Sequence, residues 1–223
     1  MAKILLLAYG CEPGRGSEAG IGWHWVDHLS KHHEVFVLTH PRGRASIERE
    51  LAQDPRPNLH IRYVELPSLL DPWRMVPGEQ AIQGRYIMWQ VAAYRVARKI
   101  VAREDIDLVH HVSWTTMTGP TLAWALGKPF IWGPVGSGQQ APLNMHRFLT
   151  PRGWFREAIR NQQVATVWLN PLARAAARKS AFAFAANLDT LHRLETLGAS
   201  SVIPPAGRRS RSILAPGSTH SGA

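Results

Sequence analysis

Residues 3–39 read KILLLAYGCEPGRGSEAGIGWHWVDHLSKHHEVFVLT and contain two apolar runs on either side of a glycine-rich loop. The runs, Lys3–Ala8 and Glu34–Thr39, are continuous rather than alternating, which is typical of strands buried on both faces. Between them, Ser17–Lys31 carries apolar residues at helical spacing. This order of strand, helix and strand predicts a parallel sheet covered by helices.

The same alternation continues along the chain. It predicts a helix over Ala45–Gln53, a strand over Leu59–Leu66, a loop through Leu69–Trp73, helix Gln80–Arg103, strand Asp107–Val112, helix Thr118–Leu126, strand Pro129–Trp132, helical segments over 151–180, strand Ala181–Ala185 and helix Leu188–Leu197. We therefore expect an α/β fold: a single Rossmann-like, doubly wound, mainly parallel sheet with helices on both faces. Ligands of such sheets bind beyond the carboxyl ends of the strands.

The composition of the chain indicates its compartment and which kinds of molecule it is expected to bind. The chain has 223 residues, 45% of them hydrophobic, and the single cysteine, Cys11, excludes an internal disulfide and fits a cytoplasmic compartment. The formal net charge of +10 attracts anionic surfaces, and we expect peripheral contact with the inner face of an anionic membrane. No helix-turn-helix, zinc knuckle or aromatic-basic strand signature is present, so nucleic acid is not an expected partner.

The glycine-rich loop has the composition of a phosphate cradle at the start of a helix. Gly14 and Gly16 with Ala19 match the dinucleotide-binding spacing Gly-x-Gly-x-x-Ala. The second strand lacks the acid that would hold a ribose hydroxyl, although Arg42 or Arg44 could take a 2′-phosphate. An NADP-dependent oxidoreductase is therefore an alternative, and an ordinary turn is another.

Two more candidate site features lie at the carboxyl ends of predicted strands. His110 and His111 end the fourth strand, where an imidazole could orient or polarise a hydroxyl; adjacent strand residues point to opposite faces, so we expect one of them to be packed. A second glycine-rich loop, Gly133–Gly138, follows the fifth strand, and its candidate acceptor-binding residues are Gly136, Ser137, Gly138 and Gln139. An ordinary strand-to-helix turn explains it equally well. Asp105 and Asp107 precede the fourth strand, so we expect no metal site there.

Three segments together resemble family 4 glycosyltransferases of the GT-B fold: EPGRGSEAG (12–20), DLVHH (107–111) and KPFIWGPVG (128–136). The resemblance covers about residues 3–204. It implies a hexosyltransferase that moves a sugar from a nucleotide-diphosphate sugar to a glycan or lipid-linked acceptor, as in polysaccharide biosynthesis. The donor is a substrate, and no cofactor is implied.

The resemblance also implies roles for particular residues. Gly16, Ser17 and Glu18 fall, together with Gly14, on the family's Gly-Gly-x-Glu-like loop beside the donor pyrophosphate, with Ser17 in place of the second glycine. His111 or His110 occupies the position where the family often places a histidine that faces the reaction centre. This N-terminal domain would hold mainly the acceptor.

Residues 1–204 form the expected family domain, and residues 205–223 have no periodicity able to build a core, so we expect that tail to be disordered. No counterpart of the family's donor domain follows residue 205, which leads us to expect a truncated or frameshifted chain. A non-catalytic acceptor-binding module that needs a separate donor-domain subunit is the remaining alternative. The basic, Trp-bearing stretch Arg147–Arg160 predicts either a membrane-surface helix or amphipathic core packing, and we expect core packing.

Overall fold

A computed structural model describes residues 1–66, 79–119 and 121–202. Its strands are β1 (Lys3–Ala8), β2 (Glu34–Thr39), β3 (Leu59–Tyr63), β4 (Leu108–Ser113), β5 (Phe130–Val135), β6 (Phe182–Ala185) and β7 (Ser201–Val202). Its α-helices are α1 (Ser17–Ser30), α2 (Arg44–Gln53), α3 (Glu79–Arg103), α4 (Pro151–Ala165), α5 (Pro171–Lys179) and α6 (Leu188–Thr196). The expected loop at 69–73 and the expected tail at 205–223 lie outside the described residues.

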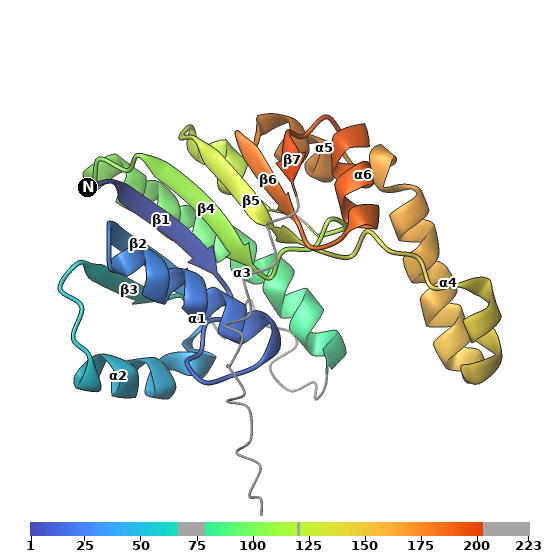
Figure 1. Cartoon of the computed structure of the whole chain (residues 1–223), viewed down its shortest axis with the longest axis horizontal. Helices are drawn as coiled ribbons and strands as arrows, with labels where there is room; N and C mark the ends of the chain where they lie inside the picture. Colours follow the sequence, from blue (N-terminus) through green and yellow to red (C-terminus); the bar gives the residue numbers. More distant parts are fainter. Residues whose placement is uncertain (67–78, 120, 203–223) are drawn as a thin grey trace, which may run out of the picture.

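The strands form one parallel sheet in the order β3-β2-β1-β4-β5-β6-β7 (Figure 1). This confirms the expected doubly wound α/β fold. The strand order reverses between β1 and β4, which is the point where open α/β sheets leave a crevice for ligands. The carboxyl ends of β1, β2 and β4 therefore meet at one edge of the sheet.

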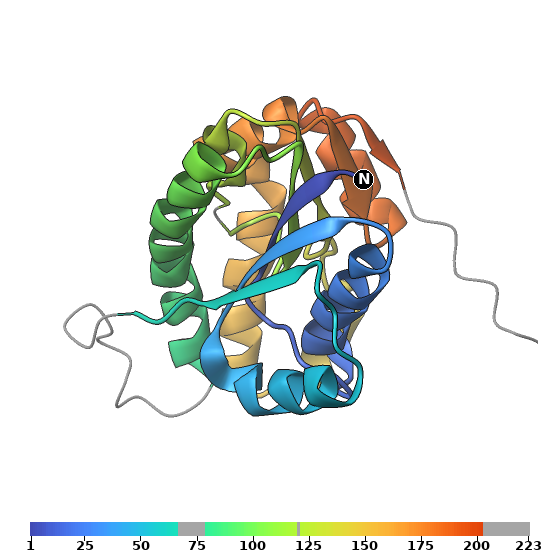
Figure 2. The same ribbon diagram turned by 90° about the vertical axis from the view of Figure 1, so that its left-hand side faces the viewer.

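Helices cover both faces of the sheet (Figure 2). On one face, Leu6 of β1 packs with Trp23 of α1 and Ile47 of α2. On the other face, Leu5 of β1 packs with Trp89 of α3. Successive residues of β1 thus bury against different helices, which is the physical reason for its continuous apolar run.

Three local expectations differ from the structure. The helix expected over Thr118–Leu126 is wrong, because only a 3₁₀ turn, η3 (Ala123–Leu126), forms there. Gly119 has low helix propensity, and Pro120 disfavours the α conformation of the residue before it. β5 runs to Val135, so half of the expected second loop belongs to a strand. β7 was not expected, because two residues are too few to leave a pattern.

Helix α1 approaches the loop that precedes it without any intervening side chain. A Cβ atom on Gly22 would lie 2.0 Å from the carbonyl oxygen of Gly10, and one on Gly20 would lie 2.0 Å from that of Arg15. Ser113 Oγ donates to the same Gly10 oxygen at 2.6 Å, which fixes the loop to the end of β4. The helical glycines are therefore explained by a neighbouring backbone.

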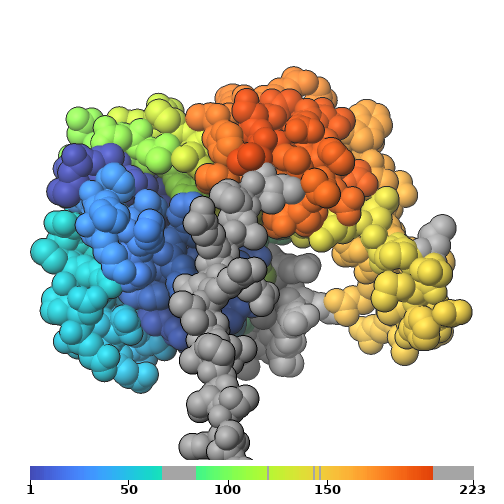
Figure 3. All heavy atoms as spheres, viewed as in Figure 1, coloured from blue at the N-terminus to red at the C-terminus, as the bar shows by residue number. Residues whose placement is uncertain are grey.

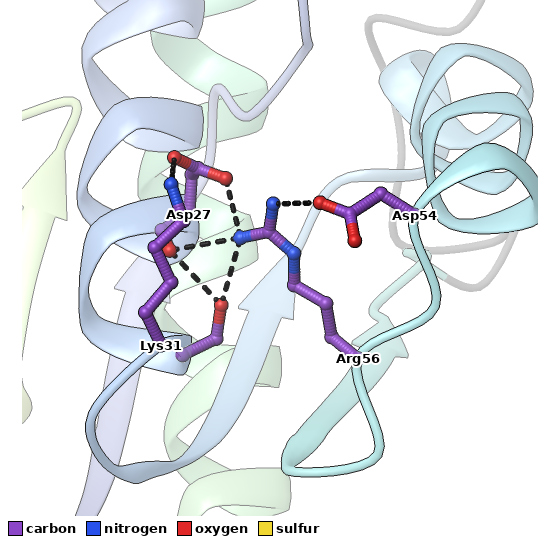
Figure 4. A network of polar contacts seen from close by, with 5 residues as sticks. Asp27, Lys31, Asp54 and Arg56 are labelled. Carbon is purple, nitrogen blue, oxygen red and sulfur yellow. Dashed lines mark hydrogen bonds and ion pairs between the residues drawn. The ribbon is translucent and has the colours of Figure 1, made fainter.

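The far end of α1 is held by an ion-pair network around Arg56 (Figure 4). The Arg56 guanidinium donates to the Asp27 carbonyl at 2.9 Å and to Asp54 Oδ2 at 2.6 Å, and it also pairs with the Asp27 carboxylate. Burial alone would raise the pKa of Asp27, but hydrogen bonds from Lys31 and Arg56 outweigh it and lower that pKa. The network joins α1 to the segment between α2 and β3.

We expect Gly22→Ala to lower the free energy of unfolding by about 1–3 kcal/mol, because the added methyl meets a fixed backbone carbonyl. That clash outweighs the gain of about 1 kcal/mol in helix propensity. Gly16→Ala is the matched control, since a Cβ there meets nothing within 4 Å. Urea unfolding of both variants measures the difference, and equal losses would contradict the close approach.

Arg56→Ala should lower the free energy of unfolding by about 1–3 kcal/mol, because it leaves a half-buried carboxylate and a carbonyl without their charged donor. Arg44→Ala is the control: its ion pair with Glu48 and its contact with the Tyr63 ring lie at the solvent-exposed surface, so their loss should cost less. Thermal or urea unfolding compares the two. A larger loss for Arg44→Ala would rule out the structural role given to Arg56.

Candidate functional site

A pocket of about 130 Å³ lies at the carboxyl ends of β1, β2 and β4. It is lined by Tyr9, Gly10, Cys11, Glu12, Arg15, Ala19, His40, Arg42, Gly43 and Trp114. These residues come from the segments that follow the three strands and from the first turn of α1. The pocket thus occupies the crevice that the strand order predicts.

The lining carries more positive than negative charge. Arg15 Nε donates to Glu12 Oε2 at 3.2 Å, so one arginine is balanced by the one acid. In the described part of the chain, the Arg42 guanidinium has no hydrogen-bond or ion-pair partner. An exposed, unpaired guanidinium among the residues that line a pocket suits recognition of a phosphate or carboxylate.

One wall of the pocket is aromatic. The Tyr9 ring lies 5.5 Å from the Trp114 ring and 5.2 Å from the His40 imidazole. Tyr86 of α3 packs behind them, and its hydroxyl donates to the Trp114 carbonyl. This wall is therefore fixed by packing against the core.

Helix α1 begins beside the pocket with two unusual residues. Ser17 has φ 63°, a left-handed conformation that L side chains rarely adopt and that favours glycine. Burial raises the pKa of Glu18, and its carboxylate has no hydrogen-bond or ion-pair partner among the described residues. Strained backbone and an unpaired, half-buried carboxylate are both features that cluster at functional sites.

The expected donor residues adjoin this pocket but do not line it. Gly14, Gly16, Ser17 and Glu18 precede or follow its lining residues, and the α1 residue that does line it is Ala19. Gly14 and Gly16 are open, with nothing within 4 Å of an added Cβ. Tyr9, His40 and Trp114 were not predicted as lining residues, although Tyr9 and His40 directly follow predicted strands and Trp114 lies two residues beyond the predicted end of the fourth strand.

Neither histidine of β4 lines the pocket. His110 is 2% exposed, packs edge-on against Trp25 at 4.7 Å, and donates from Nε2 to the Gly133 carbonyl at 2.8 Å. Burial lowers the pKa of His110 to about 4, despite the hydrogen bond to Gly133 that raises it. This imidazole is neutral and ties β4 to β5.

His111 points to the opposite face of the sheet, as the strand alternation predicts. It is 1% exposed and lies between Thr121, with Nδ1 at 2.8 Å, and Gln90 and Tyr86, with Nε2 at 3.2 and 3.3 Å. Burial first, and then repulsion between the protonated forms of the two neighbouring imidazoles, lower the pKa of His111 to about 3. Through Tyr86, His111 supports the Trp114 backbone that lines the pocket.

Two backbone donors of the candidate acceptor loop are taken up within the protein. The Gly136 N–H donates to the Thr115 carbonyl at 3.0 Å, and the Gly138 N–H donates to Thr190 Oγ1 at 3.1 Å. A Cβ on Gly138 would lie 2.5 Å from the Thr190 Cα, so this glycine serves packing against α6. Ser137, half-buried, and Gln139, exposed, remain able to present side chains.

Asp107 directly precedes β4, and its carboxylate accepts a hydrogen bond from the Lys3 N–H at 2.8 Å. It lies at the amino ends of the strands, away from the pocket. Across residues 1–66, 79–119 and 121–202, no helix has both the length and the apolar character needed to cross a membrane. No protein-family model matches the chain, and no curated protein matches it either.

The two buried histidines should make the fold less stable in mild acid. Their pKa values are lowered on folding, so the unfolded state takes up protons below about pH 6.5 while the folded state does not until about pH 4. Each histidine then costs up to about 1.4 kcal/mol per pH unit in that window. Stability is complete above about pH 6.5 and falls towards pH 4.

Urea unfolding between pH 7.5 and pH 5 measures this dependence. His110→Gln keeps a donor for Gly133 and should flatten the slope by about one proton. The same slope in wild type and His110→Gln would contradict the assignment of a buried neutral imidazole.

Proposed function

We propose that this chain is the acceptor-side domain of a family 4-type hexosyltransferase, which moves a sugar from a nucleotide-diphosphate sugar to a glycan or lipid-linked acceptor. The observation that carries the proposal is the electropositive pocket at the reversal point of the sheet. Arg15 and Arg42 outnumber the single acid, Glu12, and the start of α1 adds its positive dipole end. A diphosphate is the group that this combination suits.

The size of the pocket limits what it holds. Sites for whole drug-sized ligands measure about 300–1,000 Å³, whereas this pocket measures about 130 Å³. It therefore suits the diphosphate end of a donor and leaves the base and most of the sugar to be bound elsewhere. This fits a division of labour in which the donor is held mainly by a second domain.

The conformation of Ser17 adds support from the resemblance. The family's loop has glycine at this position, and Ser17 adopts the left-handed conformation that glycine favours. The loop geometry is thus kept although the residue differs. Glu18 follows with an unpaired carboxylate, which in this proposal accepts a hydrogen bond from a sugar hydroxyl.

For the acceptor, we propose that the side chains of Ser137 and Gln139, in the glycine-rich loop that follows β5, contact a glycan. His111 is a positioning residue in this account, because it supports Trp114 through Tyr86 and does not reach the pocket. We place the reaction in the cytoplasm, in keeping with the reduced, buried Cys11.

Calorimetric titration with UDP, GDP, ADP and their sugars tests the donor site. We expect at least one nucleotide diphosphate to bind, and Arg42→Ala to weaken binding at least about ten-fold because a charge-assisted hydrogen bond is lost. Arg49→Ala, an exposed arginine of α2 outside the pocket, is the control. If no nucleotide binds, or both variants bind like wild type, the donor-site proposal fails.

One observation favours a second candidate, an NADP-dependent oxidoreductase. Arg42 follows β2 and lines the pocket, at the position where dinucleotide-binding domains take a 2′-phosphate. NADPH and NADH belong in the same titration. Binding of NADPH but not NADH, lost in Arg42→Ala, would favour the oxidoreductase over the glycosyltransferase.

A further inference from the structure

Helix α4 exposes its apolar face. Phe155 and Ile159 are four residues apart, as are Trp154 and Ala158, so these side chains share one side of the helix. Trp154, Phe155 and Ile159 are 46%, 61% and 44% exposed. The helix projects from the body of the molecule (Figure 1), and with the preceding turn it forms a separate lobe in the space-filling view (Figure 3). The expectation of core packing for this stretch is therefore wrong.

The side of α4 that faces the protein is mainly polar. Gly153, Glu157, Arg160 and Val164 recur at spacings of four, three and four, and Val164 is the buried residue of the helix. Arg160 pairs with Glu157 and donates to the Gln139 carbonyl at 2.7 Å. Asn161 accepts from the Ala141 N–H at 3.0 Å. Polar contacts thus anchor the helix with its apolar side turned to solvent.

Arginines border the apolar side. Arg152 and Arg156 are four residues apart, and Arg152 is seven residues from Ile159, which places both beside the exposed apolar face. Just before the helix, Phe148 is 74% exposed and carries the Arg147 guanidinium 4.8 Å above its ring. The segment from residue 144 to residue 161 contains one acid, Glu157, and four arginines: Arg147, Arg152, Arg156 and Arg160.

We propose that this surface, made of Phe148, Trp154, Phe155 and Ile159 with Arg152 and Arg156, docks the protein on an anionic lipid bilayer. Aromatic and aliphatic side chains would enter the boundary between headgroups and acyl chains, and the arginines would contact lipid phosphates. The excess of positive charge argues against a second copy of the same surface as the occupant, because like charges would meet. The inference stands apart from the proposed sugar transfer.

Co-sedimentation of the full chain with vesicles tests the proposal. Vesicles of an equal mixture of phosphatidylcholine and phosphatidylglycerol should bind it, and vesicles of phosphatidylcholine alone should bind it much less. The double variant Phe155→Asp with Ile159→Asp should lose at least about ten-fold in partitioning. Circular dichroism confirms that the variant is folded, which its exposed positions favour.

A pair of charge variants separates the surface from the net charge. Arg152→Glu with Arg156→Glu should reduce binding about ten-fold, whereas Arg95→Glu with Arg103→Glu, an equal change of charge on the exposed side of α3, should reduce it far less. Absence of vesicle binding, or equal losses in the two pairs, would overturn the proposal. So would a dimer in gel filtration that Phe155→Asp with Ile159→Asp dissociates, since a second copy would then cover the face.

Discussion

The contact between α1 and the backbone of the loop before it organises this end of the molecule. Gly22 lets the helix approach the Gly10 carbonyl so closely that no side chain would fit between them. The Ser113 hydroxyl holds the same carbonyl from β4, so the loop is fixed between the two central strands. Gly10 and Ala19, on the two sides of this contact, line the pocket. The shape of the pocket therefore depends on packing between backbones that few substitutions could preserve.

Periodicity predicted every strand of the sheet except β7. Continuous apolar runs at Lys3–Ala8 and Glu34–Thr39 predicted buried parallel strands, and the structure pairs these two strands in parallel in the interior of the sheet. Periodicity failed where two residues override a pattern: Gly119 and Pro120 oppose the helix that was expected over Thr118–Leu126. It also failed for β7, which is too short to leave a signal.

The site was predictable in place but not in detail. The ends of the predicted strands gave the position of the pocket, and the glycine-rich loop after the first strand was predicted to border it. Which glycines face open space and which face a neighbouring backbone depends on contacts between distant segments, such as that of Gly138 with Thr190. The burial of both His110 and His111 could not be predicted either. Strand alternation predicts that their side chains point to opposite faces of the sheet, but not which elements cover each face. Core packing was expected for Arg147–Arg160, but α4 turns its apolar side to solvent, because an amphipathic pattern does not say which side of a helix meets the protein.

The central claim is that the pocket between β1, β2 and β4 binds the diphosphate of a donor. A crystal structure of the chain with the nucleotide diphosphate that binds most tightly tests this most directly. The account predicts phosphate oxygens within hydrogen-bond distance of Arg42 and beside the start of α1. A nucleotide bound elsewhere on the chain, with this pocket holding only water, would contradict it.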